Sequence, residues 1–537
     1  MVIVLLATSV SWLHAFQSKT EVAKCSIEGR VTNAVTGEPL RRVALSLTGP
    51  GRVAAETDEA GRFAFQDLNP GRYALTADRA GYARQTYGAR GSSTTGIPLI
   101  LSAGQQMKDI FFKLAPAALI SGRVLDEEGE PPPANTGAMA FQSSYQRGVR
   151  QWLPVGDAMV NDMGEFRIPS LAAGSYLVAA VNAQSFVSTG LSAQQPGDKP
   201  ERAYVLTFFP SATDTADAAP VQIEAGGEAS GTTIRLQKVN TVRIKGKVAG
   251  AGEGKAVVMR LSPKGVTSPA LALYQGKMVV AQQKDGSFEI KGVAPGSYLL
   301  SGALVDTQAR SQLHASLLLQ VGDRHIDGLL LQPAAPPELA GTVVVADKAG
   351  DKVNGVQVAL EAKEYVGLGS PSATADEDGK FTLKDVLPNT YWMQVRNLPE
   401  GAYVKSMRHG DQEVSEDSID LSGGVGGALQ ITLSMTGAQV DGVVQGAYEK
   451  PVTGATVVLV PDSRRYSLFK EMRTGDNGSY SFKGVPPGDY KILAWTDIET
   501  GVYQDPEFLK RYESRAEKLS LKESDRRTVS LKAIPVE

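Results

Sequence analysis

Residues 58–77 read DEAGRFAFQDLNPGRYALTA, and the order of turn and strand residues in this stretch decides the fold. It opens with an acidic residue followed by glycine, a combination that tolerates the positive φ of a tight turn between antiparallel strands. Alternation with period two from Phe63 onward predicts a strand that buries one face. A second turn, in which proline fixes φ and Gly71 supplies the flexible corner, leads to Tyr73 and another alternating strand. The stretch therefore predicts an all-β fold.

The same pattern recurs five times along the chain. Each copy opens with Gly-x-Val, and its first aromatic residue precedes its tyrosine by ten positions. Chance does not hold such a spacing five times, so the chain is predicted to be a tandem array. The openings are Gly29-Arg30-Val31, Gly122-Arg123-Val124, Gly246-Lys247-Val248, Gly341-Thr342-Val343 and Gly442-Val443-Val444. The aromatic and tyrosine pairs are Phe63 and Tyr73, Phe166 and Tyr176, Phe288 and Tyr298, Phe381 and Tyr391, and Tyr480 and Tyr490.

Each copy also ends in a further short strand, so strands and turns recur at the density of a two-sheet sandwich. We predict five tandem Ig-like or transthyretin-like β-sandwich domains, called repeats one to five. A tyrosine that follows a tight turn is expected to bond its hydroxyl to the upstream backbone. The predicted repeats are 25–116, 117–239, 240–336, 337–437 and 438–537.

Two repeats carry additions, and the linkers are short. Repeat two has an insertion near 183–219. Repeat five contains a predicted helix from Asp505 to about Lys518, with Asp505 as its cap and Pro506 in its first position. The short linkers, such as Ala115-Pro116-Ala117, favour a semi-rigid rod over a floppy string.

Composition limits the function. The chain has 55 Lys and Arg against 58 Asp and Glu among its 537 residues, without the basic stripe of a nucleic-acid-binding protein. The single cysteine, Cys25, cannot form an intrachain disulfide. Residues 1–16 are apolar but too short to span a membrane, and they suit a secretion signal cut after Ala15. We therefore expect a leader over 1–24, a secreted, periplasmic or cell-envelope location, and no transmembrane span in the mature chain.

The repeated motif resembles carboxypeptidase regulatory-like domains: Gly-x-Val, Asp-x-x-Gly-x-Phe and Pro-Gly-x-Tyr. The resemblance covers about 25–535 and is clearest in repeats one and five. Repeat one also carries Gly37-Glu38-Pro39-Leu40 and Ala80-Gly81-Tyr82, whereas Ala173 and Asn389 depart from the second turn in repeats two and four. The resemblance implies a transthyretin-like sandwich, also described as the carbohydrate-binding-like fold. It further implies a non-catalytic accessory or tandem array on an exported bacterial protein.

The sequence predicts no catalytic residue, metal or cofactor. None of the four histidines, His14, His314, His325 and His409, has glutamate three residues later, as a zinc carboxypeptidase would need. Gly-x-Ser-x-Gly and a phosphate-binding loop are also missing. A glycosidase pair of carboxylates stays open as an alternative. The acidic run 376–379 allows a calcium loop as the alternative to an ordinary turn.

Outward aromatic side chains are the best indication of a binding site. Met393 and Val395 share the inner face with Tyr391, which places Trp392 outside, and the same count from Tyr490 places Trp495 outside. Aromatic faces stack well on sugar rings. The candidate carbohydrate-binding residues are Trp152, Tyr145, Trp392 and Trp495. Alternatively, a neighbouring domain, the insertion or the helix of repeat five covers them.

These observations favour a non-enzymatic, exported binding protein whose ligand is a carbohydrate or a cell-envelope glycan. Two alternatives remain. One is a structural spacer or interaction rod that contacts another envelope protein, and the other is an accessory to a separate peptidase or transporter.

Overall fold

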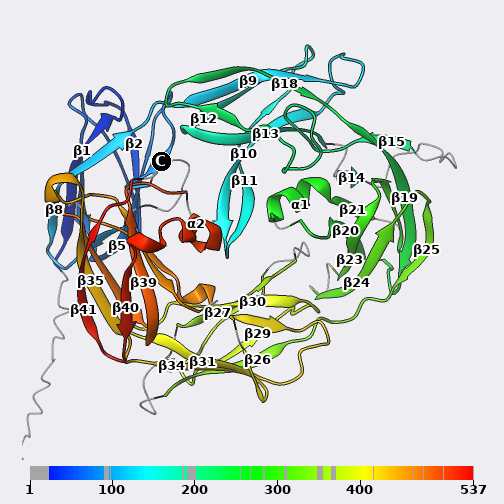
Figure 1. The fold of residues 1–537 in the computed structure, drawn as a ribbon. Helices are drawn as coiled ribbons and strands as arrows, with labels where there is room; N and C mark the ends of the chain where they lie inside the picture. The colour runs from blue at the N-terminus through cyan, green and yellow to red at the C-terminus, as the bar shows by residue number, and fades with distance from the viewer. Residues whose placement is uncertain are drawn as a thin grey trace, which may run out of the picture. The chain divides into compact units, whose positions relative to one another are not determined.

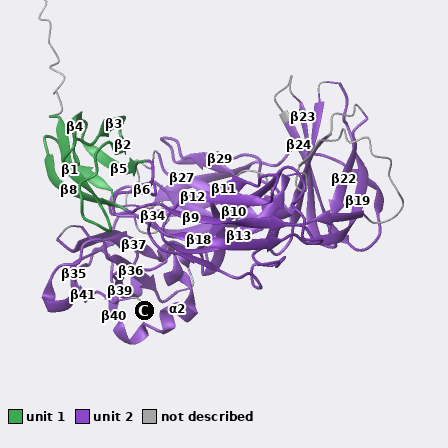
Figure 2. Ribbon diagram, turned by 90° about the horizontal axis from the view of Figure 1, so that it is seen from above, with its two compact units in different colours: residues 1–79, 98–114 green, residues 80–97, 115–537 purple. Residues whose placement is uncertain are grey.

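The computed structural model gives a chain built almost entirely of strands (Figure 1). It divides into two compact units, Met1–Arg79 with Pro98–Leu114 and Ala80–Ile97 with Ala115–Glu537, which Figure 2 colours green and purple. The predicted signal lies outside the described residues. The structure describes residues 23–89, 96, 98–183, 187–189, 201–253, 255–266, 268–281, 285–306, 311–346, 353, 355–364, 370–414, 416–463, 465–475, 477–499 and 501–535.

Unit 1 holds two sheets of repeat one. The first has the order β4-β1-β8, and in the second β2 lies between β3 and β5, with β7 also paired to β5. The strands are β1 (Cys25–Asn33), β2 (Ala44–Thr48), β3 (Arg52–Glu56), β4 (Arg62–Leu68), β5 (Gly71–Asp78), β7 (Leu99–Leu101) and β8 (Gln106–Leu114).

Unit 2 contains repeats two to five. Repeat two consists of β9 (Ala118–Leu125), β10 (Thr136–Gln146), β11 (Val149–Met159), β12 (Glu165–Leu171), β13 (Gly174–Asn182), β16 (Thr207–Phe208), β17 (Val221–Ile223) and β18 (Glu228–Arg235). Repeat three consists of β19 (Lys238–Val248), β20 (Lys255–Pro263), α1 (Pro269–Gln275), β21 (Lys277–Ala281), β22 (Ser287–Val293), β23 (Gly296–Asp306), β24 (Ser311–Val321) and β25 (Ile326–Leu331).

The last two repeats follow the same order of elements. Repeat four consists of β26 (Leu339–Val345), β27 (Gln357–Ala362), β28 (Ser372–Thr374), β29 (Lys380–Leu383), β30 (Thr390–Arg396), β31 (Tyr403–His409), β32 (Gln412–Glu413), β33 (Ser418–Asp420) and β34 (Leu429–Ser434). Repeat five consists of β35 (Ala438–Gln445), η2 (Ala447–Glu449), β36 (Thr456–Pro461), η3 (Tyr466–Leu468), β37 (Lys470–Arg473), β38 (Ser479–Val485), β39 (Gly488–Trp495), η4 (Val502–Gln504), α2 (Pro506–Lys510), η5 (Glu513–Arg515), β40 (Glu517–Leu521) and β41 (Arg526–Lys532).

All five repeats share one arrangement around the opening strand. That strand pairs antiparallel with the strand of the first aromatic residue and parallel with the closing strand of its repeat, as β9 does between β12 and β18 (Figure 1). The second sheet of each repeat pairs the tyrosine strand with the strand after the opening one, as β13 pairs with β10. The prediction of an all-β chain with five tandem sandwiches is therefore confirmed.

The opening glycine is explained by the register of these strands. In every repeat it lies opposite the first aromatic residue, as Gly341 lies opposite Phe381. A Cβ atom on Gly341 would lie 2.3 Å from the Phe381 ring, so only glycine lets this ring lie across the strand. The valine of Gly-x-Val then donates its N–H to the glycine of the acidic turn, at 2.7–2.9 Å in all five repeats. The φ of these turn glycines lies between 72° and 80°, the region that favours glycine.

The predicted tyrosine bond is present in all five repeats. Each hydroxyl donates to the carbonyl oxygen four residues upstream, at 2.6–3.0 Å, as Tyr490 does to Pro486. Each of these tyrosines is also buried in its sandwich core. The bond fixes the second turn to the strand that follows it.

These buried hydroxyls predict alkaline unfolding. Burial raises the pKa of Tyr176, Tyr391 and Tyr490 to about 12, from the value near 10 of an unfolded chain. Their stabilisation is complete below about pH 10 and is lost as the pH rises to about 12, because the unfolded state releases its protons first. We expect the free energy of unfolding of unit 2 to fall over this interval, by roughly 2 kcal/mol per tyrosine. Urea titrations at several pH values across this interval measure the fall. If a Tyr490→Phe variant lost as much unfolding free energy over the interval as the wild type, Tyr490 would not contribute to it.

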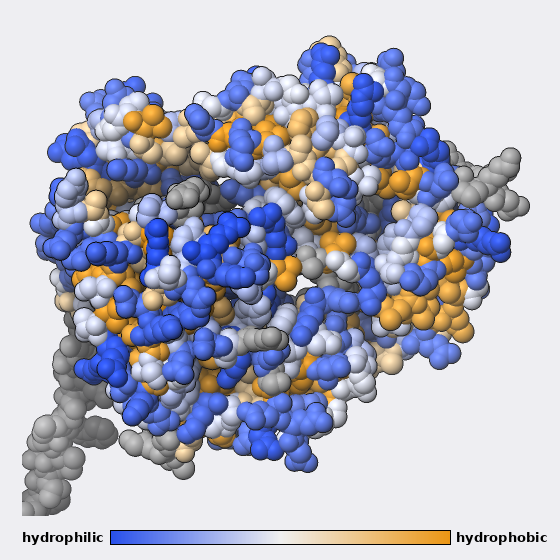
Figure 3. Space-filling model, in the orientation of Figure 1, coloured by the Kyte–Doolittle hydropathy of each residue, from blue (hydrophilic) through white to orange (hydrophobic). Residues whose placement is uncertain are grey.

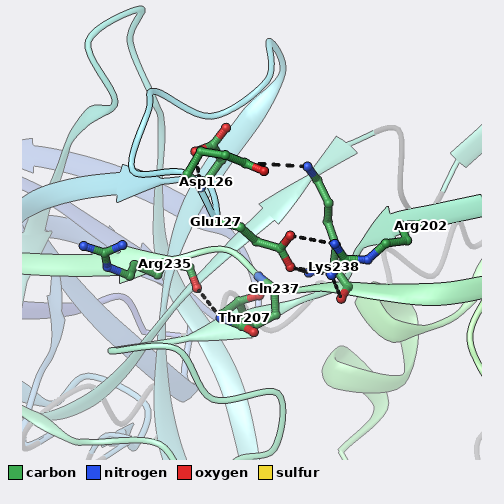
Figure 4. Close-up of polar contacts among 8 residues, drawn as sticks. Asp126, Glu127, Arg202, Thr207, Arg235, Gln237 and Lys238 are labelled. Carbon is green, nitrogen blue, oxygen red and sulfur yellow. Dashed lines mark hydrogen bonds and ion pairs between the residues drawn. The ribbon is translucent and has the colours of Figure 1, made fainter.

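The insertion of repeat two supplies strands to repeat three as well. β14 (Val187–Thr189) pairs with β21, and β15 (Glu201–Tyr204) pairs with β19. Figure 4 shows how this joint is fixed: Arg202 donates two hydrogen bonds to Glu127, at 2.7 and 2.9 Å, and the Lys238 N–H donates a third at 3.1 Å. These bonds hold the pKa of Glu127 below its usual value. The insertion thus ties repeats two and three together.

The helices differ from the prediction. Asp505 caps α2 through a bond from the Glu507 N–H, and Pro506 is its first residue, as expected. However, α2 ends at Lys510 rather than near Lys518, because the chain continues through a 3-10 turn into β40. The capped α1 was not predicted, although Ser268 before Pro269 is a start signal. Among the described residues, no helix is long and apolar enough to cross a membrane.

Candidate binding cleft

Trp392 lies on the outer face of repeat four, as the alternation predicted. Its neighbours Tyr391 and Met393 are buried in the core, while Trp392 points to the other side of the sheet and stays half-buried. Cross-strand pairing places it between Glu361 of β27 and Ser418 of β33. Two cations lie near the ring: the Lys363 Nζ is 4.0 Å and the Arg147 Cζ 5.1 Å from its centroid.

Trp495 also points away from its sandwich core, but it is not available to a ligand. Its exposed fraction is 0%, because the segment that contains η4, α2 and η5 covers it. The rings of Phe508 and Tyr512 lie 5.9 and 5.7 Å from it. The prediction that Trp495 presents a face to a sugar is therefore wrong, and the alternative of a covering helix applies.

Tyr145 and Trp152 lie on β10 and β11, the two strands of the long hairpin in repeat two. The Arg150 guanidinium lies over both rings, 5.2 Å from the Tyr145 centroid and 5.9 Å from that of Trp152. Trp152 packs beside α1 of repeat three, where the Ser268 hydroxyl donates to its carbonyl oxygen at 2.7 Å. Tyr145 packs against the cluster around Trp495. The four predicted residues thus do not form one site.

A cleft of about 750 Å³ opens beside Trp392, between repeats four and five. Its walls come from β30 and the turn before β33 in repeat four, and from β36, η3, β39 and the α2 segment in repeat five. The described lining residues are Trp392, Glu416, Val460, Pro461, Asp462, Ser463, Tyr466, Phe469, Lys491, Leu493, Gln504, Pro506, Glu507, Leu509, Lys510, Glu513 and Ala516. Aromatic rings beside a few polar groups in a concave site are typical of a small-molecule or sugar site.

Three aromatic rings form one wall of the cleft. Tyr466 meets Trp392 edge to face at 6.3 Å, and Tyr466 stacks on Phe469 at 5.9 Å with 18° between the planes. Sequence reasoning missed Tyr466 and Phe469, because they belong to no repeated motif. The available signal was a stretch with two aromatic residues between the strands 456–461 and 470–473, a connection that in repeat one is only a short turn.

A buried ion pair holds this wall in place. The side chain of Asp417, 5% exposed, accepts bonds from Nε and Nη2 of Arg465, both at 3.1 Å, and one from the Ser467 N–H at 3.0 Å. The carbonyl oxygen of Asp417 accepts the Met393 N–H at 2.8 Å. The pair thus connects the β30 strand of Trp392 to the η3 turn of Tyr466.

The lining of the cleft also contains charged side chains. Lys491 lies 2.8 Å from Glu513 and 3.9 Å from Asp462. Its ammonium group holds the pKa of Glu513 below its usual value, and Glu513 raises that of Lys491. Figure 3 shows mainly hydrophilic side chains over α2, which carries Glu507 and Lys510. The cleft therefore offers ionic hydrogen-bonding groups in addition to the aromatic wall.

A second hollow, of about 700 Å³, lies over the outer face of the β4-β1-β8 sheet in unit 1. It contains the exposed ring of Phe111, and three of its charged side chains, Arg30, Asp58 and Arg62, are already bonded within the sheet or its turns. Arg62 bonds Asp58 at 3.0 Å, and Arg30 donates to the Ala60 carbonyl oxygen at 2.8 Å. This hollow is the weaker candidate.

The described part of the chain contains no group of three or more His, Cys, Asp and Glu side chains placed to hold a metal ion. In the acidic run 376–379, Asp376 accepts the N–H groups of Asp378 and Lys380 at 3.0 and 2.8 Å. This geometry is that of an ordinary Asx turn.

Comparison with protein families supports the resemblance seen in the sequence. Residues 26–102 match the family model of the carboxypeptidase regulatory-like domain. The match lies within repeat one and agrees with the resemblance to carboxypeptidase regulatory-like domains.

Similarity to known proteins is otherwise distant. Colossin-A of Dictyostelium discoideum is 24% identical over 242 residues, which is 40% of this chain but 2% of that protein's length. The Bacillus anthracis TIE protein matches 86% of this chain and 71% of its own at 13% identity, with a TM-score of 0.15. GBS52, the minor pilin of Streptococcus agalactiae, matches 40% of this chain and 97% of its own at 14% identity, with a TM-score of 0.23. Such low TM-scores carry no argument about function.

Proposed function

We propose that this chain is a non-enzymatic, exported binding protein that takes a carbohydrate, for example a cell-envelope glycan, in the cleft between repeats four and five. The observation that carries the proposal is the meeting of Trp392, Tyr466 and Phe469 from two repeats on one wall of a 750 Å³ cleft. A sugar ring offers an apolar face for such rings and hydroxyls for the charged groups of the lining.

The charged groups of the cleft favour binding over hydrolysis. A glycosidase needs two carboxyl groups that face each other across the scissile bond. Here Lys491 holds the pKa of Glu513 below its usual value, so Glu513 is not a proton donor at neutral pH. Charged side chains of this kind suit hydrogen bonds to sugar hydroxyls.

Unit 2 contains contacts between repeats that do not follow one another in the chain. Arg147 of repeat two pairs with Glu361 of repeat four, and Ser143 bonds Glu499 of repeat five. In an extended rod only consecutive repeats touch, so these contacts favour a binding unit built from several repeats over a simple spacer.

The test is a glycan array of plant, bacterial and host sugars, with polysaccharide pull-down of the full chain. The strongest ligand is then titrated against Trp392→Ala and Phe111→Ala, each an aromatic side chain that lines one of the two hollows. We expect Trp392→Ala to weaken binding about tenfold, because stacking contributes roughly 0.5–1.5 kcal/mol beyond the area it buries. Phe111→Ala should bind as the wild type does. Arrays that stay blank would remove the proposal, and loss of binding in Phe111→Ala alone would move the site to unit 1.

A further inference from the structure

The tip of the β10–β11 hairpin in repeat two contacts Trp392 and its cross-strand partner Glu361. Arg147 Nη2 lies 2.7 Å from Glu361 Oε2, and Gln146 Nε2 donates to the other oxygen of this carboxylate at 2.9 Å. Glu361 is the cross-strand partner of Trp392, and the Arg147 guanidinium lies over the Trp392 ring. Burial alone would raise the pKa of Glu361, but these bonds hold it below its usual value, so the pair is ionised at neutral pH.

The same tip contacts the repeat-five side of the cleft. The Arg147 N–H donates to the Gln504 side chain, which lines the cleft. A Cβ atom on Gly148 would lie 2.8 Å from the Gln504 carbonyl oxygen and 3.0 Å from the Tyr466 hydroxyl. One on Gly501 would lie 2.0 Å from the Tyr145 carbonyl oxygen. The backbones of the two repeats thus approach each other with no room for a side chain.

Three lining residues, Trp392, Tyr466 and Gln504, are therefore each contacted by a hairpin that is not itself part of the lining. We propose that this hairpin tip is the positioning element of the cleft, and that Arg147 sets how the repeat-four and repeat-five parts of the lining lie relative to each other for the ligand. This inference rests on the proposed function, because it assigns repeat two a role in the same site.

The hairpin acts beside the direct contacts between repeats four and five, one of which is the buried Asp417–Arg465 pair. An exposed ion pair such as Lys483 with Glu400, between repeats five and four, contributes little. The Arg147 side chain is only 16% exposed, and it joins an ion pair with an aromatic contact. If docking of the hairpin tip and binding of the ligand favour the same arrangement of the lining, then docking raises the affinity for the ligand, and the ligand raises the docking equilibrium by the same factor.

The experiment uses three variants of the full chain, Arg147→Ala, Arg147→Lys and Arg150→Ala. Arg150 is the matched control, because it lies on the same hairpin over Tyr145 and Trp152 rather than over Trp392. The ligand is the strongest array glycan, and affinity is measured by calorimetry. Hydrogen exchange over residues 416–420 of repeat four and 465–469 of repeat five reports, without any ligand, how firmly these two parts of the lining are held.

We expect Arg147→Ala to weaken binding about tenfold, and to speed exchange in both wall segments. Arg147→Lys keeps the cation but loses the fork geometry, so it should recover part of the affinity. Arg150→Ala should change binding less than about twofold. Wild-type affinity in Arg147→Ala would overturn the inference while leaving the proposed function intact, and so would an equal loss in Arg150→Ala. If no glycan binds the wild type, the proposed function fails, and the exchange data alone decide whether the tip positions the walls.

Discussion

Replacing Arg465 with methionine is expected to destabilise repeats four and five by about 3 to 5 kcal/mol. The Asp417 carboxylate is 5% exposed and loses both guanidinium bonds in this variant, so that only the Ser467 N–H still pairs with it. An uncompensated buried charge costs far more than an exposed pair contributes. The measurement is the shift of the urea midpoint for the transition that unfolds these repeats, with hydrogen exchange to locate the loss.

Lys483→Met supplies the control, because Lys483 and Glu400 also join repeats five and four, but with side chains 53% and 79% exposed. This change should cost less than about 1 kcal/mol. Equal effects of the two substitutions would show that the Arg465 pair does not hold the junction.

Gly442→Ala, which adds one methyl group, should strongly destabilise repeat five. The added Cβ would lie 1.8 Å from the Val529 carbonyl oxygen and 2.7 Å from the Tyr480 hydroxyl. These two groups form a hydrogen bond of 2.7 Å, so the methyl group must push apart β35, β38 and β41 together. We expect a loss of about 2 to 4 kcal/mol in the unfolding of repeat five.

The comparison variant is Gly475→Ala in the same repeat, where the nearest atom to the new Cβ would be 3.7 Å away. Its effect should stay within about 0.5 kcal/mol. If Gly442→Ala were equally mild, close packing of the opposite aromatic residue would not be the reason why the opening motif begins with glycine.

Local patterns predicted what local physics determines. Turn chemistry and period two identified the strands around Phe63 and Tyr73, the tyrosine bond and the outward direction of Trp392 and Trp495. The outward direction of a side chain did not predict that it is exposed. The segment that covers Trp495 packs through tertiary contacts, which the local sequence pattern does not show. Similarly, the sequence predicted that Asp505 caps α2, but it did not predict that the helix ends as early as Lys510.

The cleft itself could not be predicted, because its parts come from distant stretches of chain. Trp392 and Tyr466 are brought together by the Asp417–Arg465 pair, and no motif marks either member. Residues of repeat two contact repeats four and five across more than two hundred positions. A search for similar modules treats each repeat as separate, and so it misses a site that several repeats build together.

The most direct test is a fluorescence titration of the full chain with the strongest array glycan, in the wild type and in Trp392→Phe. Trp392 forms the cleft wall, whereas Trp152 packs beside α1 and Trp495 is fully buried. We predict a saturable change in tryptophan emission that disappears in Trp392→Phe while the emission of the other tryptophans remains. The full wild-type change in Trp392→Phe would contradict a carbohydrate site between repeats four and five.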